Sequence, residues 1–517
     1  MNDSGWKRNM NFKDTIQNIL QPGTGFSQRV VRGGMWVFGL KISLKVIGLG
    51  RLVIVARLLD PSDFGLMGIA LLLKGVIETF SQTGFEQALI QKKEDISSYL
   101  DAAWTVQLLR GFILFAVIYA LAPLAAAFFE APHALSIIRV MGLTTFLHAF
   151  TNIGVICFKK ELEFNKQFIY QLIVSLVDTL VTVVFAFLLR NVWALVLGWL
   201  AGELTGIAVS YILHPHRPKL NFGLNKAREL FHFGKWVLGA NIVIFFATQG
   251  DDFYLGRVLG VTALGFYQMA FRVGNLPSSE IAGMIGKVAF PAYSKLQTAP
   301  EKLREAYRRV VTISTLLSIP IAGGIVVLAP LFVATFMGEK WLPVIMPLRI
   351  LALSGLFRSI AGTGGALFNA IGKPKIGFWL NVVRLSVIVI TIYPLTRLWQ
   401  ISGTSLSVLL GIASACVVWW RASVRETGIS SGAFAAVLFP PAVATLLMSG
   451  VMTVFLRATA FSLNPISAFF LSIILGGLVY LGVIFVFEKK AGYGGLRAVL
   501  LIFKNLTSSA QPRSGSL

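Results

Sequence analysis

The stretch MWVFGLKISLKVIGLGRLVIVARLL, residues 35–59, is apolar over most of its length yet carries Lys41, Lys45 and Arg51. About 20 apolar residues are enough for a helix to cross a bilayer. A charge at bilayer depth costs roughly 2.5–3.5 kcal/mol on insertion scales, so such a side chain usually faces a partner or a water-filled cavity. The stretch therefore predicts a membrane-spanning helix that borders a polar pathway.

The next apolar stretch, residues 64–90, repeats this combination of length and charge. At helical spacings of three and four residues, its polar side chains share one face: Lys74, Glu78, Ser81, Gln82 and Glu86. We expect this face to meet a second polar face on the eighth predicted span, interrupted by Pro277 and formed by Arg272, Asn275, Ser279 and Lys287.

The chain as a whole has the composition of an integral membrane protein. Of its 517 residues, 56% are apolar and only 13% are charged, about half the charge of an ordinary soluble domain. We expect an all-α membrane protein with about fourteen transmembrane helices, at approximately 35–59, 64–90, 102–128, 134–157, 167–189, 192–213, 236–258, 262–292, 310–336, 344–370, 376–397, 400–420, 433–456 and 465–487.

Lysine and arginine are distributed unevenly between the two sets of predicted loops. If the N-terminus is cytoplasmic, the inside segments hold 29 of these residues and the outside loops hold 4. Because positive charge is retained on the cytoplasmic side, we expect both termini there. The same asymmetry accounts for most of the net charge of +23, so we predict no nucleic-acid partner.

The sequence repeats itself at an offset of 200 residues. The matching pairs are Gly34 and Gly234, Trp36 and Trp236, Gly39 and Gly239, Arg57 and Arg257, and Gly65 and Gly265. Such repeats are common in transporters. Because each repeat holds six spans, we expect two pseudo-symmetric six-helix lobes related by an axis along the membrane normal. The predicted organisation is a cytoplasmic segment 1–33, an N-lobe 34–213, an inter-lobe loop 214–235, a C-lobe 236–420, two further spans in 421–487 and a cytoplasmic tail 488–517.

Thirteen cations and seven acids remain within or beside the predicted spans, an excess of +6. Some of the cations can snorkel to head groups, and Lys74 can pair with Glu78 four residues later. The cations at depth are Lys45, Arg51, Arg110, Arg272, Arg349, Arg358 and Arg384. Guanidinium binds phosphate bidentately and keeps its charge, so we expect several of these residues to line a cavity for an anionic head group.

Four acids within the spans are candidates for coupling transport to a proton or sodium gradient: Glu78, Asp178, Asp251 and Asp252. Asp178 has no basic residue three or four positions away. Adjacent carboxylates at 251 and 252 repel each other, so one of them can hold a proton. The alternative is that each acid is the structural partner of an arginine, and the sequence leaves both interpretations open.

Three segments resemble a known family. They are RLLDPSDFGLMGIA at 57–70, SQTGFEQALIQKK at 81–93 and FPAYSKLQ at 290–297. They are similar to characteristic segments of bacterial Wzx-type polysaccharide flippases, which export O-antigen, colanic acid and exopolysaccharide and belong to the multidrug/oligosaccharidyl-lipid/polysaccharide superfamily. The likeness extends over about residues 30–490.

The resemblance implies two lobes beside a cavity lined chiefly by spans 1, 2, 7 and 8. It implies that an undecaprenyl-diphosphate-linked oligosaccharide is moved across the bacterial cytoplasmic membrane by alternating access. In that case Lys45, Arg51, Lys74 and Arg272 would face the diphosphate, and the two C-terminal helices could bind the lipid tail. Arg110, Arg349 and Arg384 are further candidates. We expect a monomer without a cofactor, working with a polysaccharide polymerase and a chain-length regulator.

Two competing functions are considered. A drug or cation antiporter of the same superfamily needs an acidic cavity, which the interior excess of positive charge disfavours. A polysaccharide polymerase, ligase or glycosyltransferase needs a large extramembrane loop or domain, and the longest internal segments, 214–235 and 293–309, are too short for one. We find no nucleophile–base arrangement and no metal-ligand spacing around Cys157 or Cys416, so we predict neither catalysis nor a metal site.

Overall fold

Helices make up the fold of the computed structural model, which describes residues 26–81, 97–161, 163–221, 234–276, 278, 283–459 and 462–495; no strand occurs in these ranges. The N-terminal helices are α2 (Phe26–Leu58), α3 (Pro61–Phe80), α5 (Ser97–Phe128), α6 (Ala134–His148), α7 (Val155–Lys160), α8 (Phe164–Leu189) and α9 (Trp193–Leu213). They are followed by α11 (Gly234–Val258), α12 (Gly260–Gly274), α13 (Gly283–Lys295), α14 (Pro300–Phe332), a π-helix η2 (Val333–Met337), a 3-10 helix η3 (Glu339–Val344), α15 (Ile345–Ala370), α16 (Pro374–Thr427), α17 (Ser431–Thr459) and α18 (Pro465–Ala491).

Eight helices in the described ranges are long and apolar enough to cross a membrane, which confirms the predicted all-α membrane fold. The count of fourteen spans stays a prediction. The second predicted span is helical as far as Phe80, and residues 82–96 lie outside the described part of the chain. The eighth predicted span is two helices, α12 and α13, rather than one. The sequence between them contains Pro277, which disfavours an uninterrupted helix.

The helix α16 contains the eleventh and twelfth predicted spans as a tight hairpin. Its backbone leaves the helical conformation at Trp399, between the two predicted segments, and at Gln400, the first residue of the second. Across the hairpin, the hydroxyls of Thr396 and Thr404 lie 2.8 Å apart. At Gly403 a Cβ atom would overlap the carbonyl oxygen of Leu395, so only glycine allows the two halves this close.

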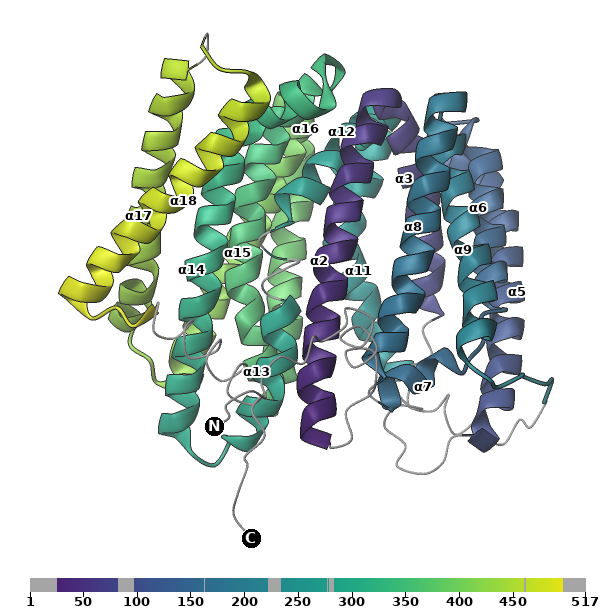
Figure 1. Cartoon of the computed structure of the whole chain (residues 1–517), viewed down its shortest axis with the longest axis horizontal. Coiled ribbons are helices and arrows are strands. Elements are labelled where there is room, and N and C mark those ends of the chain that lie inside the picture. The colour runs from purple at the N-terminus through teal and green to yellow at the C-terminus, as the bar shows by residue number, and fades with distance from the viewer. Residues whose placement is uncertain are drawn as a thin grey trace, which may run out of the picture.

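The predicted repeat appears in space as a symmetric contact between α3 and α12. A Cβ atom at Gly65 would overlap the carbonyl oxygen of Val261, and one at Gly265 would overlap that of Pro61. Adding 200 to Gly65 and Pro61 gives Gly265 and Val261, so the two contacts use equivalent residues of the two repeats. This equivalence is what an isologous interface requires. In Figure 1 the two helices lie at the boundary between the purple-to-blue N-lobe (α2–α9) and the teal-to-green C-lobe (α11–α16).

The last two helices form a separate layer on the outer side of the C-lobe (Figure 1). Met448 and Met452 of α17 are buried against Leu328 of α14. Tyr480 of α18 donates a hydrogen bond to the carbonyl oxygen of Leu316 at 2.7 Å. These contacts attach the α17–α18 pair to α14, outside the repeat, as the sequence predicted.

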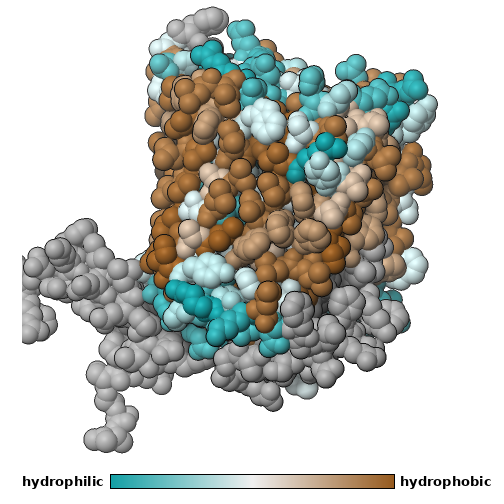
Figure 2. Space-filling view, turned by 90° about the vertical axis from the view of Figure 1, so that its right-hand side faces the viewer, coloured by the Kyte–Doolittle hydropathy of each residue, from teal (hydrophilic) through white to brown (hydrophobic). Residues whose placement is uncertain are grey.

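The surface of the helices is apolar where lipid would contact it. Along α5, large side chains such as Leu109, Phe112 and Leu124 are exposed. Figure 2, which views the molecule from the right-hand side of Figure 1, shows a broad hydrophobic band between two hydrophilic rims. Large exposed apolar areas of this kind are unusual in soluble monomers and fit a bilayer.

The two lobes are joined at one end of the molecule, which we call the Asp60 end. Lys340 donates to the carboxylate of Asp60 at 3.3 Å, and Arg257 of the C-lobe pairs with Glu130 of the N-lobe. Trp341 is fully buried and donates its indole N–H to the carbonyl oxygen of Ala56 at 2.8 Å. These contacts, together with the α3–α12 contact, close this end of the inter-lobe space.

Replacement of Trp341 by alanine should loosen the Asp60 end. The indole packs edge-on against Phe64 of the N-lobe and Phe266 of the C-lobe. Removing a buried tryptophan typically costs about 3–5 kcal/mol. We expect a markedly lower melting temperature in detergent. Trp379→Ala, which removes a side chain that is 59% exposed, should leave it within a degree or two of the parent; equal melting temperatures for both variants would contradict this.

Candidate functional site

A small pocket lies where the two lobes face each other between α2 and α12. Its volume is about 130 Å³, and Lys45 of α2 and Arg272 of α12 both line it. The other lining residues are Leu44, Gly48, Leu49, Leu52, Val273 and Leu276. Two cations from different lobes therefore border one small space whose remaining walls are apolar.

A third cation, Arg51, lies beside this pocket in an ion pair. It contacts the carboxylate of Asp178 on α8, which also accepts a hydrogen bond from Thr182 at 3.3 Å. The side chains of both partners are about one-fifth exposed. Arg272 is close enough for electrostatic interaction with both Arg51 and Asp178. Three cations, Lys45, Arg51 and Arg272, therefore gather at this place, an arrangement that suits an anion.

Close packing of α8 on α9 holds Asp178 in this position. Gly198, Gly202 and Gly206 recur every four residues on α9, the small-residue spacing that lets membrane helices approach closely. A Cβ atom at Gly202 would lie 3.1 Å from the Cβ atom of Asp178. The glycine spacing therefore fixes the depth at which Asp178 can reach α2.

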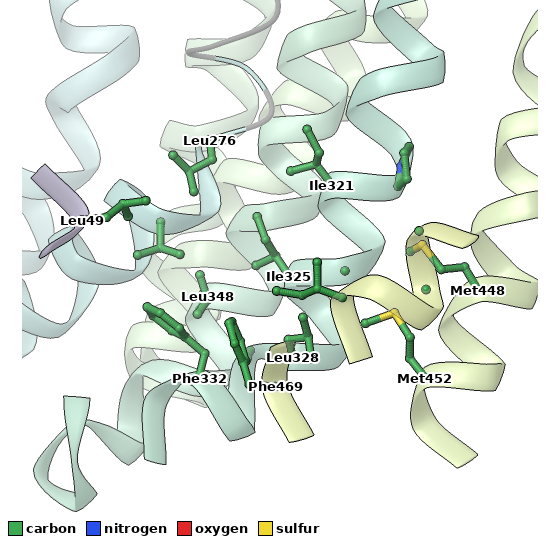
Figure 3. A pocket seen from close by; sticks show the side chains of 17 residues that line it. Leu49, Leu276, Ile321, Ile325, Leu328, Phe332, Leu348, Met448, Met452 and Phe469 are labelled. Atoms are coloured by element: carbon green, nitrogen blue, oxygen red, sulfur yellow. The ribbon is translucent and has the colours of Figure 1, made fainter. Parts of the chain in front are cut away.

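A larger apolar cavity adjoins the cationic pocket. Its volume is about 440 Å³, and it extends between α14 on one side and α17 and α18 on the other. Leu49, Val273 and Leu276 line both cavities, so the two are contiguous. Figure 3 shows Leu49 and Leu276 at one end of the larger cavity and Met448 and Met452 at the other. We call this cavity the apolar groove.

Lys74 and Arg110 do not lie at the pocket. Lys74 is buried inside the N-lobe, 3.8 Å from Glu78 and 3.3 Å from the hydroxyl of Thr144. Arg110 donates to the hydroxyl of Ser81 at 2.9 Å. For Lys74 the expectation that this polar face meets the polar face of the eighth span is wrong, because α3 turns Gly65 and Gly68 toward α12 and Lys74 toward α6 and α9. Gln82 and Glu86 of the predicted face lie outside the described residues. Ser279 and the side chain of Lys287 lie outside the described residues.

Arg349 and Arg384 also lie away from the pocket, inside the C-lobe. Arg349 donates to the backbone carbonyl of Val326 on α14 at 2.9 Å. Arg384 is buried on α16, close enough to Asp251 for their charges to interact. Helical spacing shows which residues share a face, but it does not show which neighbouring helix that face contacts. The expected role of these arginines in substrate binding stays untested.

The four predicted coupling acids fall into three places. Asp251 and Asp252 on α11 are almost fully buried in the C-lobe, where Tyr267 donates to Asp251 and Gln268 bonds to Asp252. Asp178 pairs with Arg51 and Glu78 with Lys74. For Asp178 the structure shows pairing with an arginine, which was the alternative interpretation, whereas Glu78 has the lysine partner that its spacing from Lys74 predicted. A coupling role for any of the four acids remains a prediction.

Arg358, one of the cations predicted at depth, donates to the side-chain oxygen of Asn275 at 3.0 Å and lies 5.0 Å from the ring centroid of Phe271. Two features of the molecule were not predicted from the sequence. Trp341, which closes the Asp60 end, lies in a short segment between predicted spans and had no distinguishing signal. The matched glycines at 65 and 265 were visible in the repeat, but their mutual contact was not predicted.

Residues 54–346 match the model of a family described as polysaccharide biosynthesis proteins, which is more than half of the chain. The chain belongs to the polysaccharide biosynthesis protein family. The matched region includes Asp178, Arg272 and Trp341. This membership, with the relatives below, confirms the Wzx-type resemblance derived from the sequence and makes the chain a multi-pass membrane protein of that family.

Two curated relatives and one solved structure illustrate the likeness. The lipopolysaccharide biosynthesis protein WzxC of Escherichia coli K12 is 27% identical over 363 residues, 69% of this chain and 73% of the relative. The succinoglycan biosynthesis transport protein ExoT of Rhizobium meliloti is 24% identical over 335 residues, 64% of this chain and 67% of the relative. The lipid II flippase MurJ, in an inward closed conformation, has a TM-score of 0.70 at 16% identity and covers 88% of this chain and 99% of its own. At that identity the MurJ structure supports the fold alone.

Proposed function

We propose that this protein moves a polyprenyl-diphosphate-linked glycan across the bacterial cytoplasmic membrane. The observation that carries the proposal is the contiguity of the cationic pocket and the apolar groove. A diphosphate is anionic and suits Lys45 and Arg272, whereas a polyprenyl chain is wholly apolar and suits the groove. One amphipathic molecule would satisfy both cavities at once.

The same geometry weighs against the competing functions. A cation antiporter should present carboxylates to its central cavity, but in the described residues the pocket is lined by cations and Asp178 is already paired with Arg51. A polymerase or ligase would have to act on the glycan outside the membrane. The inter-lobe pocket suits the passage of a head group rather than a reaction on it.

Alternating access is the mechanism that the contacts at the Asp60 end support. Charge asymmetry predicts that this end faces outward, with both termini in the cytoplasm. The lobes are joined there by Lys340–Asp60, Arg257–Glu130 and the α3–α12 contact. Transport would require these contacts to open while the cytoplasmic end closes. Asp251 and Asp252 are candidates for coupling to a proton or sodium gradient, and a polymerase and chain-length regulator would use the exported units.

The proposal is tested by deleting the gene in its own host and analysing the lipid-linked glycans. We expect surface polysaccharide to disappear and single lipid-linked repeat units to accumulate on the inner leaflet. If single units instead reach the outer surface without being joined, the protein acts as a polymerase. If polysaccharide is unchanged, the proposal is wrong.

Filling the apolar groove should reduce export without a change in charge. A Cβ atom at Gly477 of α18, which lines the groove, meets no atom within 4 Å, so Gly477→Trp can fill the groove without a backbone clash. The matched control is Gly482→Trp on the same helix, which is equally open but does not line the groove. We expect export to fall at least about tenfold for Gly477→Trp, because loss of about 1.4 kcal/mol of binding gives that factor. Equal export by the two variants would show that the lipid tail does not use the groove.

A further inference from the structure

A network of polar side chains inside the N-lobe binds α3 on the face opposite to its contact with α12. Its centre is Lys74, whose ammonium lies 3.3 Å from Thr144 of α6, 3.8 Å from Glu78 and 5.1 Å from the ring centroid of Trp199 on α9. Lys74 is only 7% exposed. A buried ammonium needs such partners, so the position of α3 depends on them.

The network ends in a histidine–carboxylate pair. The indole N–H of Trp199 donates to Glu203 at 3.3 Å, and the other carboxylate oxygen of Glu203 lies 2.9 Å from Nδ1 of His148. The His148 side chain is 64% exposed, whereas that of Glu203 is 19% exposed. The imidazole is therefore the more open end of the pair, and the carboxylate to which it is bonded is covered.

Protonation of the imidazole changes the charge inside the N-lobe. The described charges that act on His148 are Glu203 on α9 and Lys74 and Glu78 on α3. Arg110 on α5 faces Glu78, and Tyr170 on α8 faces Glu203. Arg139 on α6 itself lies over the ring of Tyr119, and Asp178 on α8 is paired with Arg51. In an apolar lobe an added charge favours movement of a charged group or of its helix.

We propose that the His148–Glu203 pair is a proton-binding site that controls how tightly the N-lobe holds α3. When the imidazole binds a proton, the imidazolium forms an ion pair with Glu203. The carboxylate then accepts a weaker hydrogen bond from Trp199, and Trp199 in turn contacts Lys74 less firmly. The opposite face of α3 carries Gly65 and Gly68, which contact α12. Protonation thereby reaches the inter-lobe contact through one helix. The binding site stands independently of the proposed function, but its use in coupling rests on it.

Trp199 provides a reporter for proton binding. Its emission, taken as the difference between the purified parent protein and a Trp199→Phe variant, should change in one step as the pH is lowered and the imidazole binds a proton. His148→Gln and the near-isosteric Glu203→Gln should each abolish the step. His133→Gln, at the other end of α6, should retain it. A step that persists without His148, or emission that does not respond to pH in the parent, would overturn the proposal.

Coupling is tested in proteoliposomes that contain a short-chain polyprenyl-diphosphate-linked disaccharide. We expect an imposed pH gradient to accelerate its translocation by the parent, and Glu203→Gln to translocate at a rate that no longer responds to the gradient. If Glu203→Gln still responds and Asp252→Asn does not, the coupling site is in the C-lobe and the proposed role of His148–Glu203 is wrong. If the parent translocates nothing while Trp199 still reports the proton, the proposed function fails and the proton site stands.

Discussion

Replacing Arg272 by glutamate should abolish export of the polysaccharide. Arg272 is the C-lobe cation of the inter-lobe pocket, opposite Lys45 and within reach of the charge of Arg51. A hydrogen bond to a charged group contributes about 1.5–3 kcal/mol. Reversal of the charge removes that attraction and adds repulsion, so we expect a loss of at least about 100-fold. The measurements are surface polysaccharide and the accumulation of lipid-linked repeat units on the inner leaflet.

Two further variants separate charge from geometry at this position. Arg272→Lys keeps the charge but loses the bidentate fork, so its export should fall by about tenfold rather than disappear. Arg397→Glu reverses an exposed arginine on α16 that lines neither cavity, and it should export normally. Normal export by Arg272→Glu at normal protein levels would show that the pocket does not bind the head group.

Alanine at either Gly65 or Gly265 should prevent the lobes from closing at the Asp60 end. In each case the new Cβ atom would overlap a backbone carbonyl oxygen of the other lobe. Backbone atoms cannot rotate out of the way as the end of a flexible side chain can. Overpacking typically costs about 1–3 kcal/mol where side chains can adjust, and the cost should be larger here. Because the two contacts are related by the repeat, we expect the two variants to lose export to a similar extent.

Spin labels at Ser62 and Thr262, in a background without Cys157 and Cys416, would measure the separation of α3 and α12 directly. Both substitutions should lengthen that distance relative to the parent. The control is Gly450→Ala on α17, where a Cβ atom meets nothing within 4 Å; it should leave distance and export unchanged. A strong loss for one glycine and none for its counterpart would contradict the symmetric contact.

The sequence predicted the helices and the repeat because both depend on local or periodic signals. Apolar stretches long enough to span a membrane follow from composition, and the 200-residue offset is visible in identities such as Gly65 and Gly265. From the cost of burying charge, it predicted that several of the cations at depth share a polar environment. The family resemblance implied that Lys45, Arg51, Lys74 and Arg272 face one head group, and the structure brings the first two and Arg272 together but not Lys74.

The remaining features depend on which helix faces which, and single-sequence periodicity does not specify that. The sequence showed that Lys74 and Glu78 share a face of α3, but not which helices that face contacts. Lys74 was therefore predicted at the central pocket, whereas it lies inside the N-lobe. The Arg51–Asp178 pair joins residues 127 positions apart on α2 and α8. Glycine spacing on α9 determines the depth of Asp178, and that effect appears only once the helices are packed.

The most direct test of the account is the binding of three small probes to the purified protein: a short-chain polyprenyl diphosphate, the matching polyprenol and inorganic pyrophosphate. We expect the polyprenyl diphosphate to bind at least about tenfold more tightly than either part alone, because it fills the pocket and the groove together. Arg272→Glu should remove the advantage of the diphosphate, and Gly477→Trp that of the chain. Equal affinity for the polyprenol and its diphosphate, or binding that Arg272→Glu leaves unchanged, would contradict it.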